Sequence, residues 1–351
     1  MKILGNPDWT NPAVRLKNAV ADPARRALAL AGRWTPRTAA ETETVQTETL
    51  SVAGDKPDQR RLVYAAARPE RETVENLLYT PEGMGVAAGR VVERFSVRAP
   101  SLADILKAPK SAQSEILEAT VIEAETPYTY GDWVGDFVRA LACAETIVEP
   151  VVMPPFLAQK PYVQRDLQAL GLSYSVAHAP VRIAKAHVLR KRLPSYYWSA
   201  ADVAAYRRAF AIVPPPAREG SVTYLGRFET ASESVQRQYP TETVARIVKS
   251  IGGDVFDTRK SAPTVFDDIA PGMETVIADQ GSAIFGVMHW RTRNVIELAR
   301  RDWWHSANLF IADGAGVRNY AVVAVDDLDE AALRLRIEGH LKDFGVLKTT
   351  A

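Results

Sequence analysis

The sequence predicts an α/β fold in two halves, each built on a mainly parallel β-sheet. The chain has 351 residues, which is enough for two domains of ordinary size. In each half, short apolar runs alternate with segments of helical periodicity, a rhythm typical of parallel strands joined by helices. Two breaks interrupt this rhythm, at residues 193–198 and at the three prolines of residues 214–216. We therefore expect an N-terminal domain over residues 1–195 and a C-terminal domain over residues 196–351.

The clearest element of the N-terminal half is a helix over residues 132–143. Its apolar residues recur at the i, i+3, i+4 and i+7 positions from Val134, which places them on one helix face. A buried strand follows, beginning at Ile147 or, because Pro150 disfavours a central strand, only at Val151. The other expected elements are a peripheral strand or loop at 41–49, strands at 83–87 and 90–95, a helix at 162–170, and strands at 174–176, 181–183 and 186–189.

The C-terminal half repeats the strand and helix rhythm more regularly. After a short helix at 200–210, a strand at 222–225 leads to a helix that starts at Thr241 and ends at Gly252. The remaining expected elements are strands at 254–256, 274–278, 294–298 and 321–325, a helical turn at 265–270, and a C-terminal helix at 329–344. This order predicts one parallel sheet.

The composition indicates a folded protein, with 47% apolar and 24% charged residues. The formal net charge of +1 gives no reason to expect a nucleic-acid partner. Cys143 is the only cysteine, which excludes an intramolecular disulfide and favours a reducing compartment. We find no signal peptide and no apolar stretch of membrane-spanning length. The expected location is therefore the cytoplasm, with peripheral association at a membrane surface still allowed.

Candidate ligand-binding residues follow two strands of the C-terminal half. Gln280, Gly281 and Ser282 come after a strand, where small residues let a phosphate approach the backbone and the next helix N-terminus. An ordinary tight turn between strand and helix is the alternative. Arg227 ends another strand and should point to the same edge of the sheet, where a guanidinium can bind a diphosphate. A surface ion pair is the alternative for this arginine.

Glu297 is an acid within an otherwise apolar strand. A carboxylate near the carboxyl end of a parallel strand can accept hydrogen bonds from ribose hydroxyls. The alternative is a carboxylate that caps a neighbouring helix.

Asp132 and Asp136 lie four residues apart at the start of a helix and therefore share a face. They suit a general base with a supporting partner, or acids that stabilise the first helical turn.

No metal cofactor is expected. The five histidines show no zinc-binding spacing. Residues 327–329 have the form D-x-D, but they precede the C-terminal helix and are interpreted as its cap.

Three blocks, in order and at matching spacing, resemble glycosyltransferase family 61, and its bacterial members most. The first is residues 130–137, with Asp132 at the position of the family's histidine. The second is residues 222–227, similar to a family strand that ends in serine-arginine. The third runs from residue 280 through 298 and resembles a histidine-glycine-alanine loop followed by an isoleucine-glutamate-leucine strand.

This resemblance implies a GT-B fold, in which two Rossmann-like domains face a central cleft. It implies inverting, metal-independent transfer of a sugar from a nucleotide-sugar, commonly a UDP-sugar, to a glycan or glycolipid acceptor during bacterial surface polysaccharide synthesis. The N-terminal domain would hold the acceptor, with Asp132 or Asp136 as base. The C-terminal domain would bind the donor through Arg227, Gln280, Gly281, Ser282 and Glu297.

The sequence departs from the family pattern at Asp132, at Gln280 and at Gly286, which replace two histidines and an asparagine. These departures are the reason for a second hypothesis, a catalytically inactive glycan- or nucleotide-binding protein on the same fold. A nicotinamide-dependent oxidoreductase is disfavoured, because the chain has no G-x-G-x-x-G in a suitable context.

Overall fold

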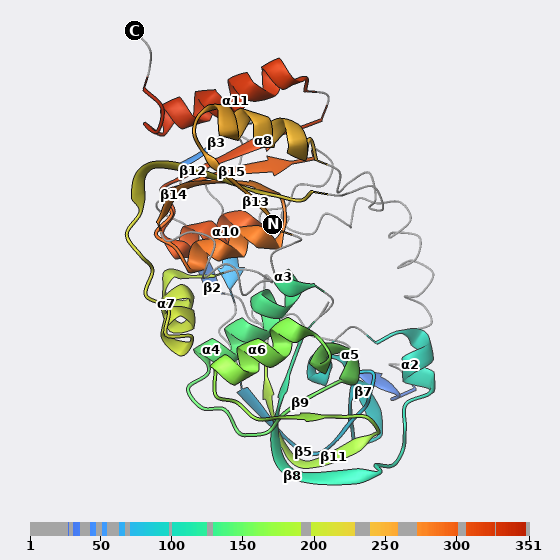
Figure 1. Ribbon diagram of the computed structural model, residues 1–351. Coiled ribbons are helices and arrows are strands. Elements are labelled where there is room, and N and C mark those ends of the chain that lie inside the picture. The colour runs from blue at the N-terminus through green and yellow to red at the C-terminus, as the bar shows by residue number, and fades with distance from the viewer. Residues whose placement is uncertain are drawn as a thin grey trace. The chain divides into compact units, whose positions relative to one another are not determined.

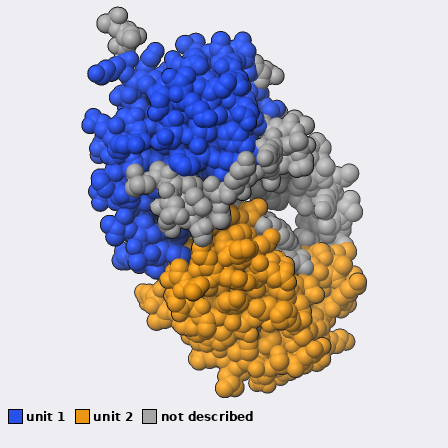
Figure 2. All heavy atoms as spheres, in the orientation of Figure 1, with its two compact units in different colours: residues 1–7, 45–64, 196–351 blue, residues 8–44, 65–195 orange. Residues whose placement is uncertain are grey.

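The computed structural model confirms an α/β fold (Figure 1). It describes residues 27, 31–35, 43–46, 51–54, 63–66, 71–97, 100–124, 129–190, 198–228, 239–258, 272–300, 307–326 and 328–348. The chain divides into two compact units (Figure 2): residues 8–44 and 65–195 form one, and residues 1–7, 45–64 and 196–351 form the other. We refer to them as the N-terminal and the C-terminal unit.

The C-terminal unit is built on a six-stranded, fully parallel sheet. Its strands, in spatial order, are β13 (Asp254–Asp257), β12 (Arg218–Gly226), β14 (Met273–Asp279), β15 (Asn294–Ala299), β16 (Asn319–Ala324) and β3 (Ser51–Gly54). From β12 the chain first moves outward to β13 and then returns past β12 to β14. The strand order therefore reverses between β12 and β14, as in doubly wound Rossmann-like sheets.

Helices cover both faces of this sheet (Figure 1). Helices α8 (Thr241–Ser250) and α11 (Glu330–Asp343) pack on one face, where Val244, Ile247 and Leu333 join the core residues of the strands. The 3₁₀ helix η7 (Ser282–Met288) and helix α10 (Ala307–Ala315) follow β14 and β15, and α10 lies on the opposite face. Helix α7 (Ala200–Ala209) belongs to the same unit.

The N-terminal unit contains an eight-stranded mixed sheet. Its spatial order is β1 (Trp34–Thr35), β7 (Arg90–Val92), β6 (Gly85–Ala87), β5 (Arg71–Tyr79), β11 (Val181–Leu189), β8 (Ser114–Ile122), β9 (Val151–Met153) and β10 (Tyr174–Val176). Strands β5, β6 and β7 pair antiparallel, whereas β11, β8, β9 and β10 run parallel. A two-stranded sheet of β2 (Glu43–Gln46) and β4 (Val63–Ala66) stands apart.

The helices of the N-terminal unit are short. They are α2 (Leu102–Leu106), α3 (Tyr130–Asp132), α4 (Arg139–Cys143), α5 (Pro155–Ala158), α6 (Pro161–Ala169) and the 3₁₀ helix Glu93–Phe95. Between α3 and α4, residues Trp133–Val138 form a π-helical segment, η4. The helix expected over residues 132–143 is thus present, with a wider turn in its middle.

Some expectations about the elements need correction. Residues 45–64 were expected in the N-terminal domain, but they cluster with the C-terminal unit, because β3 pairs in parallel with the edge strand β16. Residues 181–189 form one strand rather than two, and the strand after α4 begins only at Val151. The helical turn expected at 265–270 lies outside the described residues. No helix in the described ranges combines the length and apolarity that crossing a membrane requires.

Candidate functional site

The candidate site lies at the carboxyl edge of the parallel sheet, where the strand order reverses. Strand β12 ends at Gly226 and is followed by Arg227, and β14 ends at Asp279 and is followed by Gln280. Ligands of open α/β sheets bind at such a switch point, because the loops after the two flanking strands diverge there and leave a crevice. The topology thus brings together residues that are distant in the sequence.

Two residues at this edge, Asp279 and Thr241, hold the backbone of Arg227. Its backbone N–H donates to the Asp279 carboxylate at 2.8 Å, and its carbonyl accepts from the Thr241 hydroxyl at 3.0 Å. Its guanidinium lies directly over Gly281, where an added Cβ atom would come within 2.0 Å of Nη2. Gly281 also has φ near +151°, a conformation that residues with side chains rarely adopt. Glycine is therefore required for Arg227 to lie where it does.

Asp279 is the residue that sequence analysis missed at this site. Its side chain is buried, and it accepts a hydrogen bond from the Tyr224 hydroxyl at 2.7 Å as well as from Arg227. Burial raises the pKa of its carboxyl to about 6, although both hydrogen bonds act in the opposite direction. An acid at the end of a buried strand was the available signal, and its partners come from strand β12 and the residue after it.

Charges from three strand ends act on one phenol, that of Tyr239. Burial raises the pKa of Tyr239, the negative charges of Asp279 and Glu297 raise it further, and the positive charges of Arg227 and Arg300 lower it. Arg300 follows β15 and forms an ion pair with Asp326, with 2.7 Å between Nε and Oδ1. The carboxyl edge of the sheet therefore carries a mixed cluster of charges rather than an isolated arginine.

Gln280 and Ser282 flank Gly281 at the same edge. Gln280 is buried, and its backbone N–H donates to the Leu298 carbonyl at 2.8 Å. Within the described ranges, neither the nitrogen nor the oxygen of its amide has a hydrogen-bond partner. Such a group is costly to bury and is rare in native proteins, and a ligand is one way to satisfy it. Ser282 is half-buried and begins η7.

Glu297 lies one strand further along and is fully buried. Its two carboxylate oxygens accept hydrogen bonds from Asn308 of α10 at 2.6 Å and from Tyr320 of β16 at 2.9 Å. These bonds tie α10 and β16 to β15. These two hydrogen bonds favour a structural role for Glu297 over the role of a ribose-binding residue.

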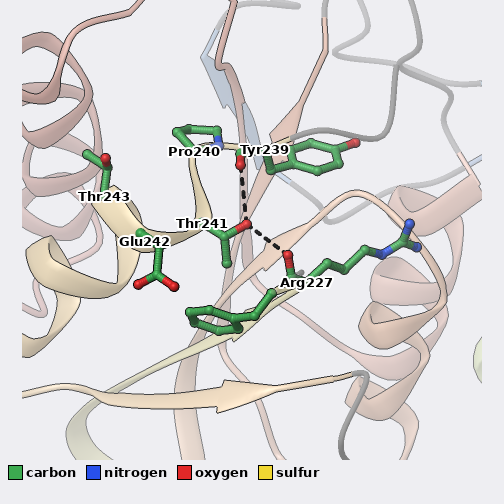
Figure 3. A pocket seen from close by; sticks show the side chains of 7 residues that line it. Arg227, Tyr239, Pro240, Thr241, Glu242 and Thr243 are labelled. Carbon is green, nitrogen blue, oxygen red and sulfur yellow. Dashed lines mark hydrogen bonds between the residues drawn. The ribbon is translucent and has the colours of Figure 1, made fainter. Parts of the chain in front are cut away.

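A pocket of about 200 Å³ opens between the end of β12 and the start of α8 (Figure 3). It is lined by Arg227, Phe228, Tyr239, Pro240, Thr241, Glu242 and Thr243. In Figure 3 the guanidinium of Arg227 and the hydroxyl of Tyr239 extend to one side, whereas the Glu242 carboxylate lies on the other. An anion would be attracted to the first side and repelled from the second.

The two acids of the N-terminal unit differ in their surroundings. The Asp132 carboxylate accepts hydrogen bonds from the N–H of Thr129 at 2.9 Å and from its hydroxyl at 2.8 Å, and the Thr129 hydroxyl accepts from the Asp132 N–H. This is a capping box, which a Thr-x-x-Asp pattern signals in the sequence. Asp136 is buried on the π-helical segment η4, a rare form that is often found at functional sites.

Two tyrosines accompany Asp132. The rings of Tyr130 and Tyr162 meet edge to face, with 5.4 Å between their centroids. Burial raises the pKa of Tyr162, and the charges of Asp132 and Asp166 add to this effect. Carboxylates beside aromatic rings are a suitable surface for a sugar hydroxyl and its ring face. Sequence analysis did not identify Tyr162, because it comes from a different helix.

Within the described ranges, no three histidine, cysteine, aspartate or glutamate side chains gather where they could hold a metal ion. Asp329 of the D-x-D pattern caps α11 by accepting from the Ala332 N–H at 2.8 Å, as expected, and Asp327 lies outside the described residues. In comparisons with known proteins, no family model matches the chain and no curated protein shows significant similarity to it.

Proposed function

We propose that the protein is an inverting, metal-independent glycosyltransferase. It would move a sugar from a nucleotide-sugar, a UDP-sugar, to a glycan or glycolipid acceptor of a bacterial surface polysaccharide, in the cytoplasm or peripherally at the inner membrane. The observation that carries the proposal is the Arg227 guanidinium held over Gly281 at the strand-order reversal. The resemblance of three sequence blocks to glycosyltransferase family 61 supports the choice of reaction.

In this proposal the C-terminal unit stabilises the leaving group. A nucleoside diphosphate gains negative charge as the bond to the sugar breaks. Arg227 is already positioned by Asp279 and Thr241, so its charge needs little reorganisation to meet that diphosphate. A fixed guanidinium can stabilise the negative charge of the leaving diphosphate, as a divalent cation does in metal-dependent transferases.

The N-terminal unit would supply the base that takes a proton from the acceptor hydroxyl. The Asp132 carboxylate already accepts two hydrogen bonds from Thr129, so Asp136 is the better candidate for the base. A GT-B arrangement, with the two units facing a central cleft, is part of the proposal because the acceptor and donor must meet.

A nucleotide- or glycan-binding protein without turnover is the second candidate. One observation favours it: Asp132, at the position of the family's histidine, closes a capping box. Nucleotide binding without any transfer or hydrolysis would select this candidate.

The experiment combines calorimetric titration of UDP with assays of a UDP-sugar panel in the presence of EDTA. Arg227→Ala is expected to weaken UDP binding by about tenfold to a hundredfold, since it removes a charge-assisted contact. Arg218→Ala is the matched control, because the Arg218 side chain forms an exposed ion pair with Asp254 at the other end of β12. Turnover is expected to survive EDTA. Unchanged UDP affinity of Arg227→Ala, or activity that requires added manganese, would contradict the proposal.

A further inference from the structure

Tyr239 is a largely buried tyrosine close to Arg227 at the carboxyl edge of the sheet. Only 8% of the residue is exposed. The Tyr239 carbonyl accepts a hydrogen bond from the Thr241 hydroxyl at 3.3 Å. Phenols that are buried to this extent usually find a polar partner, because an unsatisfied hydroxyl costs free energy.

The backbone fixes Tyr239 beside Arg227. The hydroxyl of Thr241, at the start of α8, contacts the carbonyls of both residues. From this shared point, the Tyr239 hydroxyl and the Arg227 guanidinium extend to the same side (Figure 3). The two groups therefore present a neutral donor and a charged donor to one region, the carboxyl edge between β12 and β14.

Burial and two nearby carboxylates favour the protonated phenol of Tyr239. Burial and the carboxylates of Asp279 and Glu297 raise the pKa of Tyr239 above its ordinary value, so the hydroxyl retains its proton at neutral pH. Asp279 itself is occupied by Tyr224 and the Arg227 N–H. A neutral hydroxyl donor beside a guanidinium suits an anion that presents several acceptor oxygens, as a diphosphate does.

We propose that the Tyr239 hydroxyl donates a hydrogen bond to the diphosphate of the bound nucleotide and forms, with the Arg227 guanidinium, a metal-free oxyanion site. The choice of a nucleoside diphosphate rests on the proposed function. Gln280, whose buried amide has no hydrogen-bond partner in the described part of the chain, follows the adjacent strand β14.

The test is Tyr239→Phe, which removes only the hydroxyl oxygen and preserves the packing of the ring. UDP and inorganic pyrophosphate are titrated separately by calorimetry, and the thermal midpoint is measured for each protein. Both probes are expected to bind about tenfold more weakly, as for loss of a hydrogen bond to a charged group, with the midpoint almost unchanged. Tyr79→Phe is the matched control, since Tyr79 is also a buried tyrosine but lies in the other unit.

The outcomes separate this inference from the proposed function. If Tyr239→Phe binds both probes with wild-type affinity, the inference is overturned. If Arg227→Ala still binds UDP more weakly in that case, the proposed donor site stands. Weakened binding of both probes without turnover of any UDP-sugar supports the oxyanion site and counts against a transferase. A wild-type protein that binds neither probe overturns the inference as well.

Discussion

Asp279 ends a parallel strand of one unit and Asp132 lies in a helix after a strand of the other, and the two use their carboxylates in different ways. Asp279, at the end of β14, holds the neighbouring strand β12 and its loop through Tyr224 and Arg227. Asp132, in the helix after β8, holds Thr129, three residues before it. Two carboxylates at similar positions in the topology can therefore have different roles. A carboxylate bonded to a distant loop shapes a site, whereas one bonded to its own helix start stabilises that helix.

The sheets of the two units also differ in the direction of their strands. In the C-terminal unit all six strands run parallel, so the residues after β12, β14, β15 and β16 gather at one edge. In the N-terminal unit β5, β6 and β7 alternate in direction. A parallel sheet concentrates loop residues at one edge, and the cluster around Tyr239 is the result.

The largest expected effect separates the two acids of the N-terminal unit. Asp136→Asn is expected to lower UDP-sugar turnover by about a hundredfold or more with UDP affinity unchanged, as removal of a general base does. Asp132→Asn is expected to reduce the free energy of unfolding by about 1 kcal/mol through the weakened cap, with turnover little changed. Steady-state kinetics and urea unfolding measure both. Equal loss of turnover in the two variants, or none in either, would break the distinction.

A smaller effect concerns the pH dependence that burial of Asp279 creates. Its pKa is about 6 in the folded protein, above its ordinary value of 3.8, so folding favours the protonated acid. The protonated acid contributes about 3 kcal/mol to the free energy of unfolding below about pH 4, and this contribution is lost as pH rises through 6. Asp279→Asn should lack this loss. Urea unfolding of both proteins between pH 4 and 7 measures it, and parallel pH profiles would show that Asp279 is not the titrating group.

The smallest effect tests whether Gly281 serves Arg227. Gly281→Ala is expected to displace the guanidinium and weaken UDP binding by about tenfold, without adding to the loss in Arg227→Ala, because the two residues act as one unit. Gly316→Ala is the control for glycine conformation, since φ there is also positive but a Cβ would meet open space. Calorimetric titration of UDP with the single and double variants measures the coupling. Fully additive losses would mean that Gly281 and Arg227 bind independently.

The sequence by itself determined the local parts of this protein. It predicted the α/β class, strands β12 to β16, helices α8 and α11, and the cap of α11 at Asp329, because apolar periodicity and capping residues act over a few positions. Helix α10 was not predicted. The sequence also indicated Arg227 and Gly281 as residues after two strands. That these two residues touch, and that Asp279 holds one of them, could not be seen in the sequence.

Only the tertiary structure decided which strands are neighbours. The parallel pairing of β3 with β16, and the antiparallel pairing of β5 with β11, join segments far apart in the chain. No local pattern specifies such partners, since a strand's own residues determine which face is apolar but not which edge it meets. The candidate site depends on the same strand pairing. Because β14 lies beside β12, Gly281 lies under the Arg227 guanidinium. Asp279 is buried at this edge, and burial raises the pKa of its carboxyl.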